Sequence, residues 1–217
     1  MNRGSMRTML RRRLQEVTAD QWADADLNEI LDLALSEVQG HVLAVDVEGF
    51  LSRSQSNIVA GQTLYPKPDD LRYEVALKSL DTSSGLYKRI QRRSLRDIQD
   101  RLESGTSLSD TGGYEYAHFG AFFLLAPAPS ASLAVGLEID YVPNLSMALD
   151  SDAPALPTQL HYAVVLRAHS MALGETGEEI GQPLAEYQKL IQEIPSWYLR
   201  DQAAEPNYLS AALGKEY

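Results

Sequence analysis

The sequence predicts an α+β protein in which both chain ends form a helical bundle, with a β-rich insert between the second and third helices and a C-terminal arm. Apolar residues recur at steps of three and four at both ends, and they alternate at period two through the middle. The last 22 residues follow neither period. We therefore expect a bundle from residues 1–45 and 156–195, a β-rich insert from 46–155 and an interaction arm from 196–217.

Two amphipathic helices are expected at the N-terminal end. The first covers residues 6–17, with Ser5 as its cap and arginines on the face opposite the apolar residues. The second covers residues 25–43, with Asp24 as its N-cap. Its apolar stripe repeats at steps of three and four and consists of Leu27, Ile30, Leu31, Ala34, Leu35, Val38 and Val42.

Short strands are expected in the insert, where runs of Val, Ile, Tyr and Leu are separated by turn residues. The composition of residues 82–85 predicts a hairpin turn, and Ser94 with Asp97 predicts the start of a brief helix. Residues 104–113 form a polar loop that we expect to be the most disordered internal segment. The expected strands cover about residues 55–60, 72–80, 86–92, 114–118, 120–126 and 132–142.

Two further helices are expected before the arm. The third begins near Thr158 and is apolar on more than one face, so several neighbours should bury it before a glycine-rich stretch ends it. The fourth has Pro183 in its first turn, and Pro195 ends it. We expect all four helices to share one core, formed by residues 6–43 and 158–194.

The arm after Pro195 is too apolar for a solvated tail, although it has no regular period. We expect it to be ordered mainly by a partner protein or a neighbouring subunit. The residues that would form this contact are Trp197, Tyr198, Tyr208, Leu209, Leu213 and Tyr217.

Composition excludes several kinds of site. The chain has no cysteine, and its four histidines lack the spacing of metal ligands. No glycine-rich phosphate-binding motif is present, so we expect no metal, no cofactor and no enzymatic activity. No apolar run approaches the roughly 18 residues of a membrane span, and the basic N-terminus lacks the apolar core of a signal peptide.

The net charge of −11 comes entirely from the second half of the chain. Residues 1–101 hold 15 basic and 15 acidic side chains, whereas residues 102–217 hold 4 and 15. Acidic surfaces repel phosphate, which disfavours sequence-independent nucleic-acid binding. The chain has one dense basic run, which comprises Lys88, Arg89, Arg92, Arg93 and Arg96. These side chains form either a surface that is solvated or makes salt bridges, or a phosphate-binding site. A DNA-binding regulator using this run and the first helices, and a hydrolase using paired carboxylates, remain alternatives.

Four short segments occur in an order that is typical of a known family. They are an Arg-rich helix with Trp22, Asp24 and a Leu-Asn pair, then Val59-Ala60-Gly61-Gln62 with Tyr65, Pro66 and Asp69-Asp70-Leu71, then residues 122–141 around a proline-rich turn, and Leu156-Pro157 before a helix. Together they resemble the head-to-tail adaptor (connector) proteins of tailed bacteriophages, including the tail tubular adaptors of short-tailed phages. The resemblance covers roughly residues 6–194.

This resemblance implies a structural virion protein without enzymatic activity. It implies assembly in the host cytoplasm into a ring, typically of twelve copies, between the portal protein and the tail or nozzle protein in the neck of the virion. DNA would pass through the lumen as cargo, and no membrane would be involved. In the family pattern the last helix begins nearer Glu178, with Pro183 as a kink. The aromatic tail after Pro195 has no strong counterpart in the family pattern, and its expected contact with the portal or a neighbouring subunit follows from its apolar residues.

Overall fold

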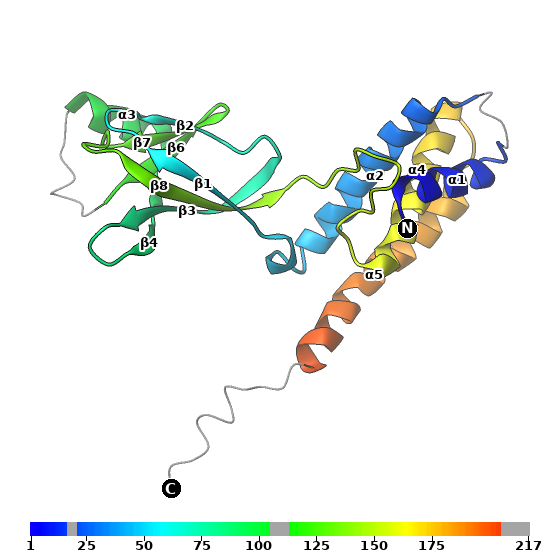
Figure 1. The fold of residues 1–217 in the computed structure, drawn as a ribbon. Coiled ribbons are helices and arrows are strands. Elements are labelled where there is room, and N and C mark those ends of the chain that lie inside the picture. Colours follow the sequence, from blue (N-terminus) through cyan, green and yellow to red (C-terminus); the bar gives the residue numbers. More distant parts are fainter. Residues whose placement is uncertain (17–20, 105–112, 205–217) are drawn as a thin grey trace, which may run out of the picture. The chain divides into compact units, whose positions relative to one another are not determined.

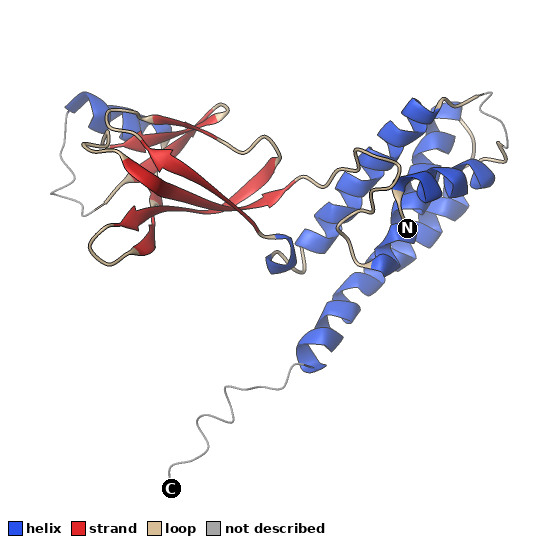
Figure 2. Cartoon of the chain, viewed as in Figure 1, coloured by secondary structure: helices blue, strands red, loops and turns tan. Residues whose placement is uncertain are grey.

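The computed structural model of the protein describes residues 1–16, 21–104 and 113–204 (Figure 1). The chain divides into two compact units, one from Met1–Val47 together with residues from 145 onward, and one from Glu48–Asn144. The first is helical, and the second holds the strands together with one α-helix (Figure 2). We call them the helical unit and the β unit. The α+β prediction is confirmed.

Within the described residues, the helical unit contains the α-helices α1 (Arg3–Arg13), α2 (Asp24–Leu43), α4 (His161–Thr176) and α5 (Gly181–Ala204). A 3-10 turn at Thr158–Leu160 leads into α4, which packs against α1, α2 and α5. This central position explains why α4 is apolar on several faces. The expected packing of the N-terminal helices against the C-terminal ones is therefore confirmed, and fully buried residues of this core include Met6, Leu10, Leu31, Leu35, Val38, Val164, Val165 and Leu166.

Both N-terminal helices begin at different residues from those predicted. The side chain of Asn2 accepts a hydrogen bond from the Ser5 amide at 2.9 Å, so Asn2 caps α1 and Ser5 lies inside it. The helix ends at Arg13, before Gln15 adopts a φ of 56°. In α2 the N-cap is Ala23 instead of Asp24, whose carboxylate accepts a hydrogen bond from Arg11 at 2.7 Å. Asp24 thus forms an ion pair with Arg11, and the local cap comes from Asp26, whose carboxylate accepts a hydrogen bond from the Ala23 amide at 3.2 Å.

The arginines of α1 attach this helix to the rest of the unit. Arg7 donates two hydrogen bonds to Asp150, at 2.8 and 2.6 Å, and a third to Asn28 at 3.1 Å. Arg3 pairs with Asp32 at 2.9 Å and also bonds the carbonyl of Met147. Because these partners lie in α2 and in the segment before α4, the polar face of α1 is a binding face within the molecule.

Replacing Asp150 with asparagine is expected to lower the melting temperature of the helical unit at neutral pH, with a difference from the wild type that shrinks below about pH 4. The hydrogen bond and charge of Arg7 hold the pKa of Asp150 below its ordinary value of 3.8. A lowered carboxyl pKa stabilises the folded state above the unfolded pKa, and this contribution is lost as the pH falls through the folded pKa. Calorimetry of both proteins across the acid range measures it. Glu29→Gln, at an exposed position of α2, is the control, and a pH-independent difference would contradict the prediction.

The two C-terminal helices are separated as the glycines indicated, but the second is longer than predicted. Gly177, with a φ of 75°, caps α4, and Pro183 lies in the first turn of α5, so the start near Glu178 is wrong. Pro195 does not end α5, which continues to Ala204. A proline removes its own amide donor, but the following residues include the good helix formers Leu, Arg, Gln and Ala, which extend the helix.

The β unit consists of two four-stranded sheets around a common core. The first sheet has the order β1 (Ser52–Ile58), β8 (Leu133–Pro143), β3 (Leu71–Asp81) and β4 (Leu86–Arg89). The second has the order β2 (Leu64–Pro66), β7 (Phe122–Ala126), β6 (Glu115–Phe119) and β5 (Gln91–Arg92), with β5 parallel to β6. Side chains from both sheets meet in one cluster, which includes Ile58, Tyr65, Leu77, Tyr116, Phe123, Leu125, Leu137 and Ile139.

Most of the strand predictions hold in place, with three differences. The expected strand 86–92 is split into β4 and β5 at Ile90, and β2 was not predicted. In β8 the alternating residues Leu137, Ile139 and Tyr141 are buried, but Val135, which continues the same alternation, is 42% exposed. Helix α3 (Leu95–Ser104) begins where Ser94 accepts a hydrogen bond from the Asp97 amide. The loop predicted at 104–113 lies largely outside the described residues.

Candidate interaction surfaces

The predicted basic run is divided among three elements of the β unit, and most of its charges are engaged. Lys88 in β4 pairs with Asp81 at 2.6 Å, and Arg89 donates to the carbonyl of Val75. Arg93 pairs at 3.0 Å with Glu115, which is 5% exposed. Arg92 in β5 and Arg96 in α3 are exposed, and neither has a partner among the residues that the structure describes. Two of the five charges therefore form ion pairs, a third donates to a backbone carbonyl, and two are exposed to solvent.

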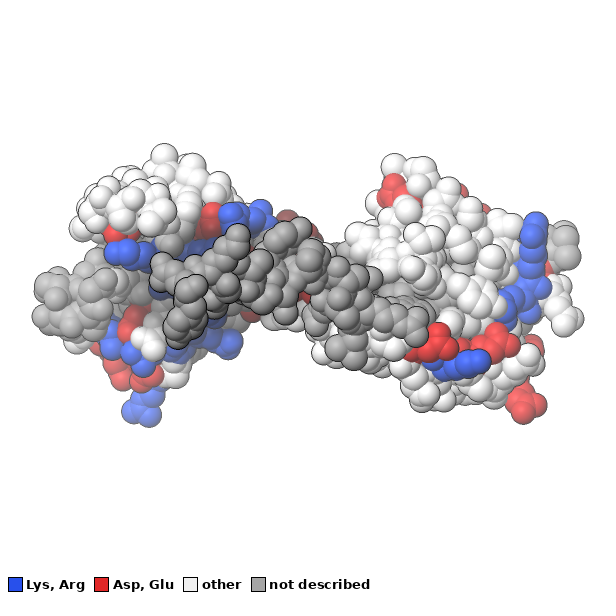
Figure 3. All heavy atoms as spheres, turned by 90° about the horizontal axis from the view of Figure 1, so that it is seen from below, with Lys and Arg blue, Asp and Glu red and all other residues white. Residues whose placement is uncertain are grey.

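The distribution of charge on one face of the molecule agrees with this assignment. On the face drawn in Figure 3, basic and acidic side chains lie next to one another over both units. A phosphate-binding surface would need a field of basic side chains that is not neutralised by its neighbours. The mixed charge favours the interpretation of the basic run as salt-bridging side chains over its interpretation as a phosphate-binding site.

A second charged cluster, on the outer face of the first sheet, was not singled out from the sequence. Glu138 and Asp140 alternate with the apolar core residues of β8, and Glu138 is itself only 3% exposed. Arg53 contacts both carboxylates, at 3.3 and 2.9 Å. Lys78 contacts Glu138 at 3.1 Å and also pairs with Asp140. Burial alone would raise the pKa of Asp140, but the hydrogen bonds and charges of Lys78 and Arg53 hold it below its ordinary value. These paired carboxylates are neutralised by cations, which stabilises three neighbouring strands.

Two of the histidines, His118 and His161, have polar partners within the protein. His118 Nε2 lies 2.5 Å from Glu74, which also accepts a hydrogen bond from Tyr116, so this carboxylate links the two sheets. His161 Nε2 lies 3.0 Å from the carbonyl of Leu156, and burial lowers its pKa. No group of three potential metal ligands occurs in the described ranges. Nor does any helix in them have the length and apolar character needed to cross a membrane.

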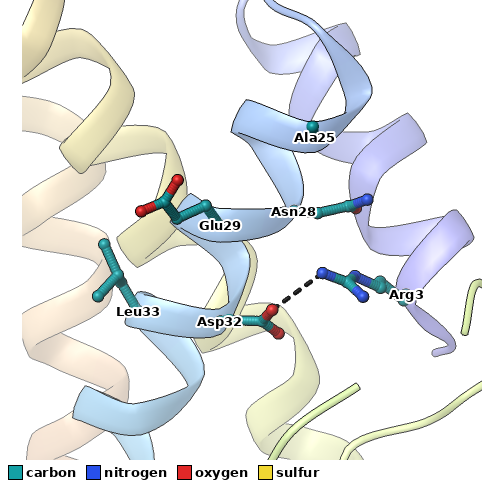
Figure 4. Close-up of a pocket in the computed structure, with 6 residues that line it drawn as sticks. All are labelled: Arg3, Ala25, Asn28, Glu29, Asp32 and Leu33. Atoms are coloured by element: carbon teal, nitrogen blue, oxygen red, sulfur yellow. Dashed lines mark hydrogen bonds and ion pairs between the residues drawn. The ribbon is translucent and has the colours of Figure 1, made fainter. Parts of the chain in front are cut away.

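A hollow of about 520 Å³ lies between α1 and α2 (Figure 4). The side chains drawn there come from α2, except for Arg3 from α1, which reaches across to Asp32. Burial raises the pKa of Asp32, against the effect of the Arg3 charge. The remaining lining residues are Ala25, Asn28, Glu29 and Leu33, which provide no nucleophile or acid–base pair beside this ion pair.

Helix α5 extends beyond the other helices of its unit (Figure 1). The ring of Tyr187 lies 6.2 Å from that of His41 and 5.7 Å from the guanidinium of Arg167. Tyr187 of α5 therefore lies beside His41 of α2 and Arg167 of α4 along the bundle axis. The end of α2 is two residues past His41, and the start of α4 is six residues before Arg167. Because α5 runs antiparallel to α4, its residues beyond about 193 pass both of these helix ends.

A comparison with known protein families gives a match over nearly the whole chain. The family described as SU10 adaptor protein matches residues 1–212. The chain belongs to the SU10 adaptor protein family. These are phage head–tail adaptors, so the resemblance seen in the sequence is confirmed and this adaptor is a structural protein, not an enzyme. No curated protein sequence matches the chain.

The residues predicted to form the arm contact of the adaptor are placed only in part. Trp197 and Tyr198 belong to the last turns of α5, so the arm does not begin as an irregular segment after Pro195. Tyr208, Leu209, Leu213 and Tyr217 lie outside the described residues. Their role in binding stays a prediction.

Replacing Arg93 with methionine is expected to lower the free energy of unfolding of the β unit by about 1–3 kcal/mol, because Glu115 is buried and would keep only its contact with Arg101. Arg92→Met, one residue earlier, removes an exposed side chain and is expected to change stability by less than about 0.5 kcal/mol. Calorimetry of both variants measures the difference. Equal effects would show that Arg93 belongs to the solvated surface.

Proposed function

We propose that this adaptor forms a ring between the portal protein and the tail or nozzle protein, in the neck of the virion, and that DNA passes through the lumen. The family match over residues 1–212 carries this proposal. Twelve copies, as the resemblance implies, is the expected number, with assembly in the host cytoplasm. The proposed partners are further copies of the chain, the portal and the tail.

The charge of the chain fits the passage of DNA. The acidic excess of residues 102–217 would repel phosphates if it lined the channel, and a repulsive wall does not hold DNA in place. The competing proposal of a DNA-binding regulator needs a free basic surface, whereas Lys88 and Arg93 are paired with carboxylates. Salt-dependent retention of DNA by the purified adaptor would favour the regulator.

The proposed portal or subunit contact is the arm, residues 196–217. Its first residues continue a helix that already extends past α2 and α4, so they are in a position to reach another protein. Aromatic residues such as Trp197 and Tyr198 commonly supply much of the energy of such contacts.

The mass of the purified adaptor, alone and mixed with the portal protein, tests the proposed ring. For the adaptor alone we expect either a monomer or a ring. For the adaptor mixed with the portal protein we expect a ring of many copies on the portal, visible by native mass spectrometry or electron microscopy. An adaptor that stays monomeric in both conditions would contradict the proposal.

A further inference from the structure

The first sheet of the β unit has two edge strands, β1 and β4 (Figure 1). Within the residues that the structure describes, β1 pairs only with β8, and β4 pairs only with β3. The other side of each edge strand therefore presents backbone amides and carbonyls that have no strand partner. Among the edge strands described, β1 offers the longest such side, with seven residues against four in β4, three in β2 and two in β5.

The sequence of β1 does not block the addition of another strand. Edge strands are commonly protected by proline, by lysine or by a β-bulge. β1 has no proline and no lysine, and its pairing with β8 is irregular only near its end, between Ser56 and Ile58. Its one charged residue, Arg53, contacts Glu138 and Asp140 of β8 and is thereby held over the face of the sheet. Nothing in β1 itself therefore prevents backbone pairing with a strand of another chain.

The two edge strands of this sheet run in opposite directions. The pairs β1–β8, β8–β3 and β3–β4 are all antiparallel, so three reversals separate β1 from β4. Rotation of a copy about an axis parallel to the strands leaves the strand directions unchanged. Under such a rotation β1 of one copy meets β4 of the next as an antiparallel pair, which is the pairing that the rest of the sheet already has. Pairing of β1 with β1 would need a twofold axis instead, which a ring of this kind does not supply.

The strand β4 carries an apolar side chain that its own sheet does not cover. Leu86 is 66% exposed, the largest exposed fraction of the large apolar side chains described. It pairs with Asp81, four residues after the buried Leu77 in β3, so it lies on the side of the sheet that faces the core. In β1 the core residue Ile58 lies on the same side. A pairing of the two edges that places Leu86 beside Ile58 would therefore cover the exposed leucine.

Charge selects the register between the two edges. Arg89 of β4 lies on the outer face of the first sheet, as do Arg53 and Gln55 of β1. Placing Arg89 opposite Arg53 would bring two like charges together, which destabilises a cross-strand pair. Opposite Gln55, the guanidinium meets an amide whose nitrogen donates to Glu138 at 2.9 Å and whose oxygen has no partner among the described residues. That oxygen can accept a hydrogen bond from Arg89.

We propose that β1 of one copy pairs antiparallel with β4 of a second copy of this chain, with Gln55 opposite Arg89 and Ile58 opposite Leu86. The proposal rests on the proposed ring and names one of its subunit contacts. Because the pairing joins two different edges, it repeats head to tail, which is the arrangement that closes into a ring when the rotation between copies permits. The first sheets of successive copies then form one continuous antiparallel sheet, in which backbone hydrogen bonds provide the affinity.

The absence of cysteine from the sequence permits a direct test by disulfide cross-linking. In the proposed register Ser56 lies opposite Lys88 of the second copy. Full-length Ser56→Cys and Lys88→Cys chains are mixed, assembled with the portal protein and oxidised, and a covalent dimer that contains one chain of each variant is expected. Arg96→Cys, at an exposed position of α3 in the same unit, is the control and is expected to give no cross-link with Ser56→Cys.

A second measurement tests the register by exchange of charge. Gln55→Arg places a cation opposite Arg89 and is expected to raise the concentration needed for assembly by about tenfold or more. Adding Arg89→Glu to the same chain replaces the repulsion with an ion pair and is expected to restore assembly to within about twofold of the wild type. The melting temperatures of both variants check that the β unit stays folded.

The outcomes separate this proposal from the proposed ring. Rings that form without the cross-link between positions 56 and 88, or that cross-link equally well to Arg96→Cys, would overturn the contact and leave the ring intact. Assembly that is unaffected by Gln55→Arg, or that Arg89→Glu does not restore, would also overturn the contact. Absence of any ring with the wild-type chain would overturn both proposals.

Discussion

Replacing Leu31 with aspartate is expected to abolish the cooperative unfolding transition of the helical unit. Leu31 is fully buried in α2, within the core that α2 shares with α4. An aspartate there removes the buried leucine and introduces a charge without a partner, at a cost of about 4 kcal/mol or more. Domains of this kind have total stabilities of about 5–15 kcal/mol. Circular dichroism at 222 nm during heating measures the loss.

The matched control for this variant is Leu33→Asp. Leu33 lies two residues further along the same helix and is 56% exposed, so the same substitution there is expected to change stability by less than about 0.5 kcal/mol. A Leu31→Asp protein that melts like the wild type would show that the terminal helices do not form one core.

Deleting residues 196–217 is expected to leave a folded subunit that no longer joins the portal, with affinity lowered by about a hundredfold or more. The deletion begins after Ile194, which is buried, so the core of the helical unit keeps its described members. It removes the part of α5 that extends past α2 and α4 together with the residues that follow. Pull-down or calorimetric titration with purified portal protein measures the affinity.

A shorter deletion, of residues 205–217 alone, serves as the comparison because it retains all of α5. A partial loss of affinity would then divide the contact between the helix and the segment after it. Normal binding by the longer deletion, or strong hydrogen-exchange protection of the arm in an isolated monomer, would show that the arm is not an interaction segment.

The sequence was most informative where one periodic pattern extended over many residues. The stripe of α2 and the alternation of Leu137, Ile139 and Tyr141 in β8 were long enough to average out local exceptions. The three-residue strand β2 was missed because a period of two cannot be recognised in so short a run. Pro195 was misleading because a proline is a strong local signal, whereas the continuation of α5 depends on the helix-forming residues after it.

The candidate surfaces depended on contacts that a linear pattern does not contain. Arg93 appeared to belong to a basic patch, but Glu115, 22 residues later, lies against it because β5 and β6 are neighbours in the sheet. Strands that overlap β1 and β4 could be predicted from sequence. Their place at the two edges of one sheet could not be predicted, since it follows from the pairing of β8 with both β1 and β3.

The division of the helical unit between the two ends of the chain affects how it is made. When α2 leaves the ribosome, its apolar stripe has no α4 to cover it, because 117 residues separate Leu43 from His161. At translation rates of about 5–20 residues per second, that interval lasts about 6–23 s. The β unit, whose strands are contiguous in the chain, becomes available for folding during this time. Synthesis thus favours a folding order in which the β unit forms first. Helices α1 and α2 pack into the helical unit only after α4 and α5 have been made.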